Sequence, residues 1–376
     1  MIKADMKQFV LCWLFNLEEK MFQERTNLLQ KKLKEMHFDC FLVTEPTNRF
    51  YLSGFSGDDG VLLITAKNQY LITDWRFERQ IQQECPNWKL CLTRNYLQEV
   101  CQLAQKLNLT ALAFEDSLSY ANYGFLDENF PGDLAAVTQI IEQLRSVKEP
   151  AEIQVLKRSC QIAGKGYLAV LDLMKNNSAA LTELALSHYL DGFMLKQGAS
   201  GKSFTTIVAS GEHSTWPHAT ATNQLIGQNT MVTLDFGYFY HGYTSDVTRT
   251  FAIGPQTTEF RELYQLVLKA QQATIQAIVP GVMGSKLDKI GRGIITQAGY
   301  GKYFNHGMGH GIGLAIHELP NVGQRFTDQL FPGQIITIEP GVYVPGIGGV
   351  RIEDDILVTE TGYEVLTDFD RQYHEL

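Results

Sequence analysis

The sequence predicts a two-domain protein, an α/β domain followed by an α+β domain with an antiparallel sheet. Its 376 residues exceed the ~250–300 at which a single hydrophobic core stops growing. Strand-like and helical segments alternate up to about residue 140, and after that point longer helices come before and between strand-rich segments. We therefore expect an N-terminal domain over residues 1–142, with 1–20 as a possible extension, and a second domain over residues 143–376.

The N-terminal domain is predicted from hydrophobic periodicity and from turn residues. Apolar runs of strand length end at a proline or at polar residues, and longer segments repeat their apolar residues at helical spacing. In order, the expected elements are a helix at 22–36, a buried strand at 38–46, a hairpin at 60–74, a helix at 97–108 and a strand at 109–115.

The second domain opens with a long amphipathic helix. Pro150 stands at its start, with Glu149 and Glu152 around the first turn, where acidic side chains favour the helix dipole. The remaining segments then alternate in type. We expect helices at 181–198 and 257–278 and strand-rich segments at 231–253 and 334–360.

Composition and charge exclude several classes of protein. The formal net charge is −9, which argues against a nucleic-acid or anionic-membrane partner, since phosphate binding needs a basic face. No apolar run reaches the ~18 residues of a membrane span. The apolar stretch 9–17 runs directly into charged residues, so we expect an N-terminal helix, or a start upstream of Met21, and not a signal peptide.

The six cysteines show no metal-binding or redox spacing. We interpret them as buried thiols of a protein in the reducing cytoplasm. They are Cys12, Cys40, Cys85, Cys91, Cys101 and Cys160.

A glycine-rich segment, "NHGMGHGIGLAIHELP", holds three of the nine histidines. His306, His310 and His317 are accompanied by four glycines on alternate positions, each costing roughly 1 kcal/mol inside a helix. We therefore expect extended or looping backbone packed closely against another part of the protein.

Four acidic residues stand inside apolar β-forming sequence, where carboxylates are disfavoured. They are Asp235 in "VTLDFG", Asp246 in "YTSDVTRT", Glu339 in "ITIEPG" and Glu353 in "VRIEDD". Burying an unpaired carboxylate costs several kcal/mol, so four of them require cations. Two divalent ions balance four carboxylates, and a nitrogen ligand from the glycine-rich segment is expected beside them.

Hairpin geometry brings these acids together in pairs. If the chain turns at Tyr240-His241, Asp235 lies directly opposite Asp246, with Cβ atoms ~5 Å apart on one face of the sheet. A Pro/Gly-rich turn region, "PGVYVPGIGG", separates Glu339 from Glu353 and permits their two strands to pair.

Four motifs in this order resemble a known family: "LDFGYFYHGYTSDVTRTF", "HGMGHGIGLAIHE", "IEPGVY" and "RIEDD". Together they look like the pita-bread metallopeptidases, which include aminopeptidase P, prolidase and methionine aminopeptidase. The first domain resembles the creatinase/prolidase N-terminal domain. Methionine aminopeptidases commonly lack such a domain, and creatinase lacks the metal ligands, so the resemblance favours an Xaa-Pro peptidase.

The resemblance also implies a role for each site residue. The two metal ions are expected to be bound by Asp235, Asp246, His310, Glu339 and Glu353, with Asp246 and Glu353 bridging them. Substrate is expected to contact His218, His306 and His317, while Arg351 supports the ligands. Manganese is the expected metal, with cobalt or zinc as alternatives, because the site is rich in oxygen and holds one imidazole.

The expected reaction is hydrolysis of an amide by a water that the two ions activate. Glu339 would move the proton from that water to the leaving nitrogen, and His218 or His317 would stabilise the oxyanion. We expect an Xaa-Pro aminopeptidase that takes peptides with proline in second position. The alternative is an Xaa-Pro dipeptidase (prolidase). A homodimer is expected by analogy with the family.

Two other classes are disfavoured. A catalytically inactive binding protein on the same fold would be expected to lack ligands, and none is missing here. A nucleotide-binding enzyme is disfavoured because "GMGHGIG" has neither the dinucleotide spacing nor a Gly-Lys-Ser/Thr phosphate loop.

Overall fold

The computed structural model describes residues 20–177 and 181–376, and it divides the chain into two compact units that meet between Leu144 and Arg145. The predicted combination of an α/β domain and an α+β domain with antiparallel sheets is confirmed. The apolar stretch 9–17 and Cys12 lie outside the described residues.

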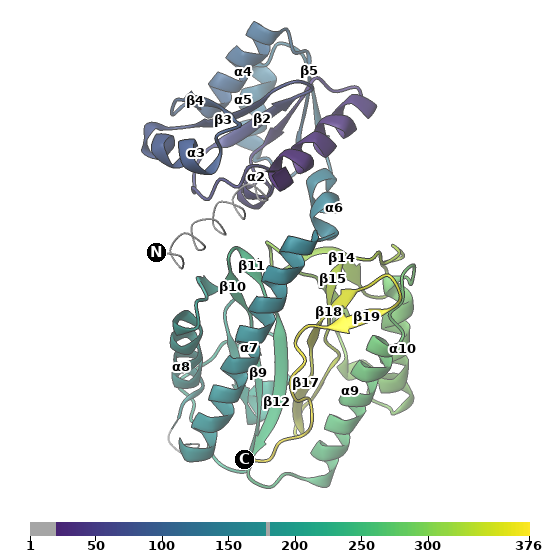
Figure 1. The fold of residues 1–376 in the computed structure, drawn as a ribbon. Coiled ribbons are helices and arrows are strands. Elements are labelled where there is room, and N and C mark those ends of the chain that lie inside the picture. The colour runs from purple at the N-terminus through teal and green to yellow at the C-terminus, as the bar shows by residue number, and fades with distance from the viewer. Residues whose placement is uncertain (1–19, 178–180) are drawn as a thin grey trace, which may run out of the picture. The chain divides into compact units, whose positions relative to one another are not determined.

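The first unit is a six-stranded mixed sheet with the order β4-β3-β2-β1-β5-β6 and helices on both faces (Figure 1). Its first helix is described over residues 20–35. The other elements are β1 (Cys40–Val43), α2 (Pro46–Ser53), β2 (Val61–Thr65), β3 (Gln69–Thr73), α3 (Glu78–Glu84), β4 (Lys89–Leu92), α4 (Tyr96–Leu107), β5 (Ala111–Glu115), α5 (Tyr120–Asn129), β6 (Asp133–Val137) and α6 (Ile140–Ser146), which crosses the division.

The core of this unit confirms the elements expected from periodicity. The predicted hairpin is formed by β2 and β3, in which Ile64 pairs with Gln69. Apolar side chains of β1, β2 and β5 pack against those of α4 and α5. Among the cysteines of the described ranges, Cys40, Cys85, Cys101 and Cys160 are buried as expected, but Cys91 is only half-buried because its strand, β4, is at the sheet edge.

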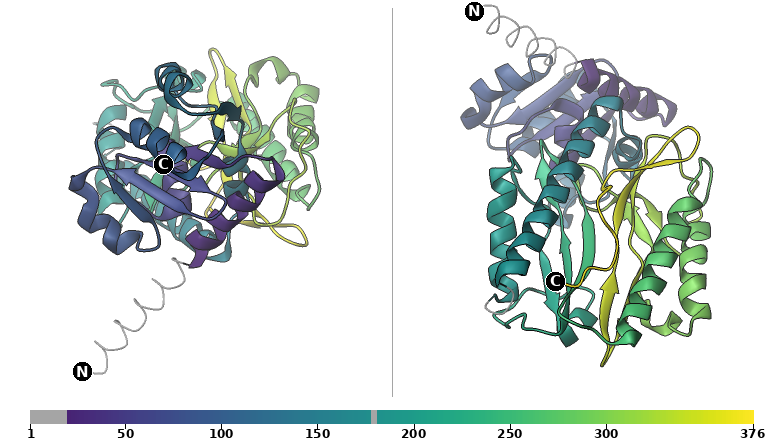
Figure 2. Two further views of the ribbon diagram at one scale, coloured as in Figure 1. Left: turned by 90° about the horizontal axis from the view of Figure 1, so that it is seen from above. Right: turned by 60° about the horizontal axis from the view of Figure 1, so that its bottom comes forward.

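The second unit has two halves, each with a pair of helices beside strands (Figure 2). The first half contains α7 (Pro150–Asn177), α8 (Glu183–Lys196), β7 (Gly201–Lys202), β8 (Ile207–Ser210), β9 (Thr230–Phe236), β10 (Tyr238–Tyr240), β11 (Tyr243–Thr244) and β12 (Val247–Ile253). The second half contains α9 (Thr258–Gln276), α10 (Gly284–Gln297), β13 (Gly309–Gly311), β14 (Glu318–Val322), β15 (Ile335–Ile338), β16 (Gly341–Val344), β17 (Gly348–Arg351), β18 (Asp354–Val358) and β19 (Tyr363–Val365).

Each half has its own apolar core, and hydrogen bonds join the halves along β12. Side chains of α7 and α8 pack on β9 and β12, and those of α9 and α10 pack on the sheet β14-β13-β15-β18-β19. Across the seam, the backbone N–H of Glu353 donates to the carbonyl of Thr248 at 3.1 Å, and that of Arg351 donates to Oγ1 of Thr250 at 3.2 Å. The chain around residues 349–353 therefore lies beside β12.

The predicted register of the first acidic hairpin is wrong by two residues. The turn is at His241-Gly242, where φ is 48° and 83°, as a two-residue type I′ turn requires. Asp235 consequently pairs with Thr248 and not with Asp246. A shift of two residues leaves the side chains on the same face, so the two carboxylates still point to one side of the sheet.

The second acidic hairpin follows the prediction. Gly341 pairs with Arg351, and Ile338 pairs with Asp354. One register runs through both pairs, and in that register Glu339 stands opposite Glu353. Among the described residues, none of the helices combines the length and apolar character that crossing a bilayer requires.

Candidate metal centre

His310 lies on β13, where glycines allow the backbone to pack tightly. A Cβ atom at Gly309 would collide with the carbonyl oxygen of Thr337, and one at Gly311 would collide with that of Leu319. The extended, closely packed backbone expected for the glycine-rich segment is therefore confirmed. It brings the His310 imidazole to the seam between the two halves.

Four of the five predicted ligands form one cluster at this seam. Oxygen atoms of Asp246 and Glu353 and a nitrogen of His310 all lie within 4.8 Å of one another. Nε2 of His310 is 3.6 Å from Oδ2 of Asp246 and 3.6 Å from Oε1 of Glu339. The fifth residue, Asp235, is the last but one of β9, and its Oδ1 is buried without a hydrogen-bond partner.

The imidazole of His310 presents a lone pair to the carboxylates. Burial, with the neighbouring His317 ring, lowers the pKa of His310 to about 4, so the ring is neutral at pH 7. Its Nδ1 donates to the carbonyl of Gly311 at 3.1 Å, which leaves Nε2 as the acceptor. A backbone carbonyl commonly fixes a metal-binding histidine in this tautomer.

Burial opposes ionisation of the clustered carboxylates. It raises the pKa of Asp246 and of Glu353 well above their usual values, and the carboxylates repel one another in addition. Burial also raises the pKa of Glu339 to about 7, although the charge of Arg351 acts in the opposite direction. Such a site holds its full negative charge only when a cation is present.

Arg351 connects the acids to the surrounding side chains. Its Nη2 lies 2.5 Å from Oδ2 of Asp235, and its Nε donates to Oγ1 of Thr248 at 3.1 Å. Oγ1 of Thr248 in turn donates to Oε2 of Glu353 at 2.7 Å. Nη1 of Arg351 donates to the hydroxyl of Tyr343 at 2.7 Å.

His306 lies at the other end of this series of hydrogen bonds. Its Nε2 lies 3.0 Å from the Tyr343 hydroxyl, and its Nδ1 lies 3.8 Å from Oε2 of Glu339. Burial and the charge of Arg351 lower the pKa of His306 to about 3. Because Tyr343 accepts from Arg351, its own proton points to Nε2, and Nδ1 of the neutral ring carries the hydrogen.

The other two predicted histidines lie at the edge of the cluster. The His317 ring packs edge-on against the His310 ring, with centroids 4.4 Å apart, and burial and the nearby His218 lower its pKa. His218 is exposed and lies in a loop whose two ends are held by the buried carboxylate of Glu183. That carboxylate accepts hydrogen bonds from the backbone N–H groups of Ser210 at 2.7 Å and Thr222 at 3.1 Å.

Sequence reasoning missed Thr248, Tyr343 and Glu183. Strand alternation could have identified the first two, because Thr248 is two residues from Asp246, and Tyr343 is two residues from Gly341 in the strand that follows Glu339. Glu183 gives no such signal, since an acidic residue in the first turn of a helix is ordinary.

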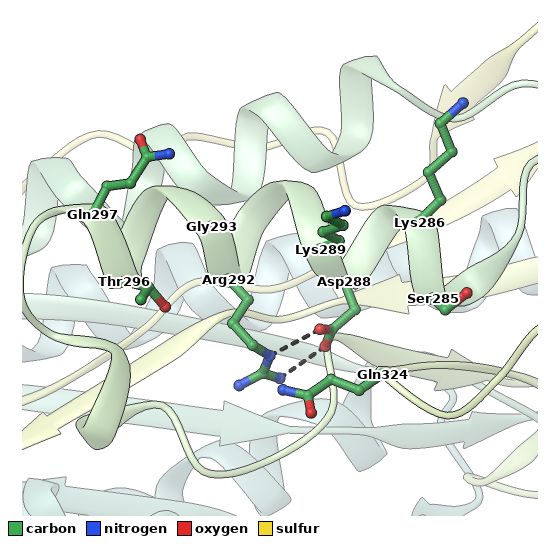
Figure 3. Close-up of a pocket in the computed structure, with 9 residues that line it drawn as sticks. All are labelled: Ser285, Lys286, Asp288, Lys289, Arg292, Gly293, Thr296, Gln297 and Gln324. Carbon is green, nitrogen blue, oxygen red and sulfur yellow. Dashed lines mark hydrogen bonds and ion pairs between the residues drawn. The ribbon is translucent and has the colours of Figure 1, made fainter.

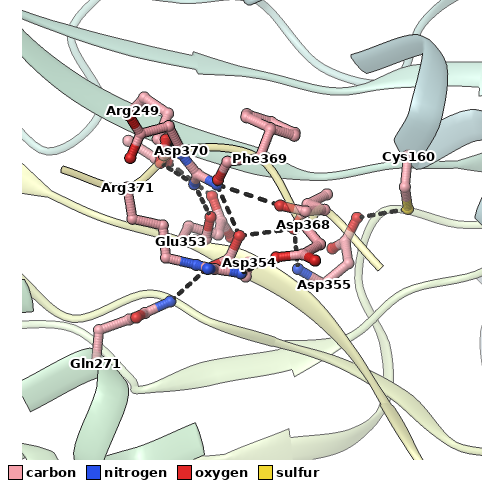
Figure 4. Close-up of polar contacts among 12 residues, drawn as sticks. Cys160, Arg249, Gln271, Glu353, Asp354, Asp355, Asp368, Phe369, Asp370 and Arg371 are labelled. Atoms are coloured by element: carbon pink, nitrogen blue, oxygen red, sulfur yellow. Dashed lines mark hydrogen bonds and ion pairs between the residues drawn. The ribbon is translucent and has the colours of Figure 1, made fainter. Parts of the chain in front are cut away.

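A second buried acidic group lies beside the first (Figure 4). Asp354 accepts hydrogen bonds from Arg249 at 2.8 Å, Gln271 at 2.6 Å and Thr367 at 2.8 Å, and it also pairs with Arg371. We refer to these five residues as the Asp354 cluster.

The next residue, Asp355, supports the candidate ligands from behind. Its Oδ2 accepts the backbone N–H of Asp246 at 2.9 Å and the thiol of Cys160 at 3.3 Å. Burial raises the pKa of Asp355 to about 8. Burial also raises the pKa of the Cys160 thiol, so the sulfur stays protonated and acts as a hydrogen-bond donor.

Two halves joined along β12, with carboxylates and a histidine at their junction, define the pita-bread class of metal-dependent peptidases. Residues 154–360 match the model of metallopeptidase family M24, and residues 25–147 match that of the creatinase/prolidase N-terminal domain. The chain belongs to metallopeptidase family M24. It is a metallo-exopeptidase that hydrolyses peptides, and membership of the family implies divalent metal ions, as the resemblance predicted.

Individual relatives share both domains with this chain. A structure of an Xaa-Pro dipeptidase from Bacillus anthracis is 38% identical, with a TM-score of 0.91, covering 94% of this chain and 100% of that one. The Xaa-Pro dipeptidase of Pyrococcus furiosus is 34% identical over 93% of this chain and 99% of its own. An X-Pro aminopeptidase structure from Thermotoga maritima is 31% identical, with a TM-score of 0.84, covering 90% and 98%.

Proposed function

We propose that this chain is a dinuclear Xaa-Pro dipeptidase, which hydrolyses a dipeptide to a free amino acid and proline. The observation that carries the proposal is the convergence of the Nε2 lone pair of His310 with oxygens of Asp246 and Glu339, each 3.6 Å away. The proposed ligands are Asp235, Asp246, His310, Glu339 and Glu353. Asp246 and Glu353 are the proposed bridging pair.

The donor set fits two divalent ions. Four carboxylates and one imidazole suit manganese, cobalt or zinc, and we propose manganese because oxygen donors predominate. The buried, unpartnered Oδ1 of Asp235 supplies one further donor atom. Ions held there supply Lewis-acid chemistry, which lowers the pKa of a water and polarises the scissile carbonyl.

Glu339 is the proposed proton carrier. Its Oε1 lies 3.6 Å from Nε2 of His310, so the carboxylate is beside the proposed metal site, where it can accept a proton from the attacking water. It would take a proton from the attacking water and deliver it to the leaving nitrogen of proline, which has no N–H of its own in the peptide. Nδ1 of His306 lies 3.8 Å from Oε2 of Glu339 and donates its hydrogen to the carbonyl of Gly307 at 2.9 Å.

The remaining residues orient substrate. His317 and the exposed His218 are proposed to donate to the substrate carbonyl or to the oxyanion. Arg351 is proposed to hold Asp235 and, through Tyr343, His306. His306 is proposed to line the substrate pocket.

The dipeptidase is favoured over the aminopeptidase first expected because relatives named Xaa-Pro dipeptidase align along almost the whole chain. The aminopeptidase is the second candidate, supported by the name of the Thermotoga maritima structure. Hydrolysis of Gly-Pro and Gly-Pro-Pro after loading with manganese separates them, with Pro-Gly as the control. We expect Gly-Pro to be cleaved with a kcat/KM at least about tenfold higher, which is 1.4 kcal/mol of transition-state discrimination. Preferential cleavage of the tripeptide would favour the aminopeptidase.

Other properties are proposed from the resemblance and from composition. We propose a homodimer in the cytoplasm, in keeping with the free cysteines of the described residues. The proposed domain boundary is at 142/143, within two residues of the structural division after Leu144. Sedimentation velocity tests the dimer, and a monomer at micromolar concentration would contradict it.

A further inference from the structure

An ion pair on α10 lies behind the segment that carries His306. Asp288 and Arg292 are one helical turn apart, and their side chains form a bidentate pair (Figure 3). Nε of Arg292 donates to Oδ2 of Asp288 at 2.8 Å, and Nη2 donates to Oδ1 at 2.7 Å. Only 1% of the Asp288 side chain and 17% of the Arg292 side chain are exposed, so this is a partly buried pair with a fixed geometry.

Arg292 also binds the backbone on both sides of Asn305. Its Nη1 donates to the carbonyl of Phe304 at 2.8 Å, and its Nη2 donates to the carbonyl of His306 at 2.7 Å. The guanidinium carbon lies 3.9 Å from the centre of the Phe304 ring. Nε, Nη1 and Nη2 are all used, and the planar group stacks on an aromatic ring, which a lysine cannot reproduce.

The imidazole of His306 is thus held from two directions. Arg292 fixes its backbone carbonyl from α10, and Tyr343 contacts its Nε2 from β16. The Phe304 ring, on which Arg292 stacks, packs edge-on against the imidazole with centroids 5.0 Å apart. The guanidinium holds the backbone that carries both rings, and the imidazole is oriented by its hydrogen bonds with Tyr343 and with the carbonyl of Gly307.

We propose that Asp288 and Arg292 are positioning residues for the reaction: Asp288 orients Arg292, and Arg292 fixes His306 against the substrate pocket. Arg292 acts through His306 and contacts no candidate metal ligand in any described hydrogen bond. The inference rests on the proposed role of His306 in substrate binding. It adds a helix of the second half to the parts that determine activity.

The cavity beside α10 offers a control residue for testing the proposal. A cavity of about 720 Å³ there is lined by Arg292, Asp288, Lys289 and Gln324, among others, and by none of the candidate ligands (Figure 3). Lys289 is exposed on the same helix and lines the same cavity, so Lys289→Met is a matched control. Asp288→Asn combined with Arg292→Gln removes the hydrogen bonds of Arg292 to the carbonyls of Phe304 and His306. The double variant leaves no buried carboxylate unpaired, so the folded state should keep its stability.

The first experiment is a double-mutant cycle with His306→Ala, measured as kcat/KM for Gly-Pro. Arg292→Gln, and the double variant Asp288→Asn/Arg292→Gln, are expected to lower kcat/KM by about 10- to 100-fold, with the content of bound manganese unchanged. In the His306→Ala background the same changes are expected to lower it by less than about twofold. Arg292→Lys is expected to recover only part of the lost kcat/KM. Lys289→Met is expected to leave kcat/KM unchanged.

Three outcomes would overturn the inference. An equal loss in both backgrounds would mean that Arg292 acts independently of His306. Loss of bound manganese in Arg292→Gln would mean that the pair supports the metal site as a whole. Unchanged activity of His306→Ala would remove the proposed role of this histidine, while leaving the metal centre and the peptidase activity in place.

Hydrogen exchange at residues 304–308 provides a readout that does not depend on activity. Exchange is expected to accelerate in Arg292→Gln and to stay unchanged in Lys289→Met. If the wild-type protein cleaved no Xaa-Pro substrate, the proposed function would fail, and this measurement would still decide whether Arg292 holds the segment. Unchanged exchange in Arg292→Gln would show that Arg292 does not hold the backbone of residues 304–308.

Discussion

Glu353 and Asp354 are neighbours in sequence, yet their carboxylates are buried in two different environments. Glu353 faces the candidate metal centre, where its one hydrogen-bonded side chain in the described contacts is Thr248. Asp354 faces the opposite side of the strand and is bonded to Arg249, Arg371 and Gln271 (Figure 4). Adjacent residues of extended backbone point to opposite sides, so the short segment that enters β18 serves both environments.

The difference lies in where the positive charge comes from. In the Asp354 cluster two guanidinium groups belonging to the chain face one carboxylate. In the candidate metal centre four carboxylates share one guanidinium, that of Arg351, which pairs with Asp235. A buried carboxylate with arginine partners is neutralised by the chain itself, whereas a group of carboxylates without such partners requires ions from solution.

The largest expected effect distinguishes the two environments by activity. Glu353→Gln or Asp246→Asn is expected to lower kcat/KM by about 10³-fold or more, because several kcal/mol of metal-dependent transition-state stabilisation are lost. Bound manganese, measured by elemental analysis, should fall as well. The metal-free variant should unfold at an equal or higher urea concentration than the metal-free wild type, because a buried amide avoids the cost of ionising a buried carboxylate.

The control for these variants is Glu364→Gln, which removes an exposed partner of Lys157 and should leave activity unchanged. A Glu353→Gln enzyme that retained full activity and metal content would show that Glu353 is not a ligand.

The next effect is on stability and concerns the Asp354 cluster. Arg249→Met is expected to lower the free energy of unfolding by about 3–5 kcal/mol, because Asp354 would lose a fully buried partner. Urea denaturation measures the change. The double variant Arg249→Met/Asp354→Leu should recover much of the loss. If Arg249→Met were as stable as the wild type, the proposed division between structural and metal-binding carboxylates would not hold.

Metal and pH together give the third effect. Manganese at 100 times its dissociation constant should stabilise the protein by about 2.7 kcal/mol for each site. Without metal, the folded protein keeps protons on Glu339 and Asp355, whose pKa values are about 7 and about 8, while the unfolded chain releases them at lower pH. Stability of the metal-free form should therefore fall as pH rises from about 5 to 8.

The metal-bound form should show a smaller decline, because binding displaces the proton of the ligand Glu339 but not that of Asp355. Urea midpoints in EDTA and in manganese chloride across this pH range test both statements. A metal-free protein whose stability increased with pH would contradict the raised pKa values.

The smallest effect concerns the thiol behind the site. Cys160→Ala removes one of the donors to Asp355 and is expected to cost about 1 kcal/mol of stability. Cys160→Ser retains a donor and should cost less. Activity should change by less than about fivefold in either variant, as measured with Gly-Pro. A loss as large as that of Glu353→Gln would mean that Cys160 takes part directly in the metal centre.

Much of the distinction between metal-binding and structural carboxylates was predictable from sequence. Carboxylates inside β-forming segments identified Asp235, Asp246, Glu339 and Glu353, and alternate glycines predicted the extended strand of His310. The roles of Asp354 and Asp355 were not predictable, because their partners Arg249, Arg371 and Cys160 are distant in sequence and their contacts depend on tertiary packing.

Two other features escaped prediction for local reasons. The first hairpin turns at His241-Gly242, and positive φ is uncommon for any residue other than glycine, so the turn position and the register were misplaced. Helix α10 contains glycines at 284, 291 and 293, which lower helix propensity. For this reason neither the helix nor its Asp288–Arg292 pair was predicted.

The seam between the halves has a consequence for biosynthesis. The five candidate ligands extend from Asp235 on β9 to Glu353, which precedes β18 near the end of the chain. A ribosome must therefore pass residue 353 before the last of them exists. Chains terminated before that residue would lack hydrolytic competence, so they could not degrade the peptides around them.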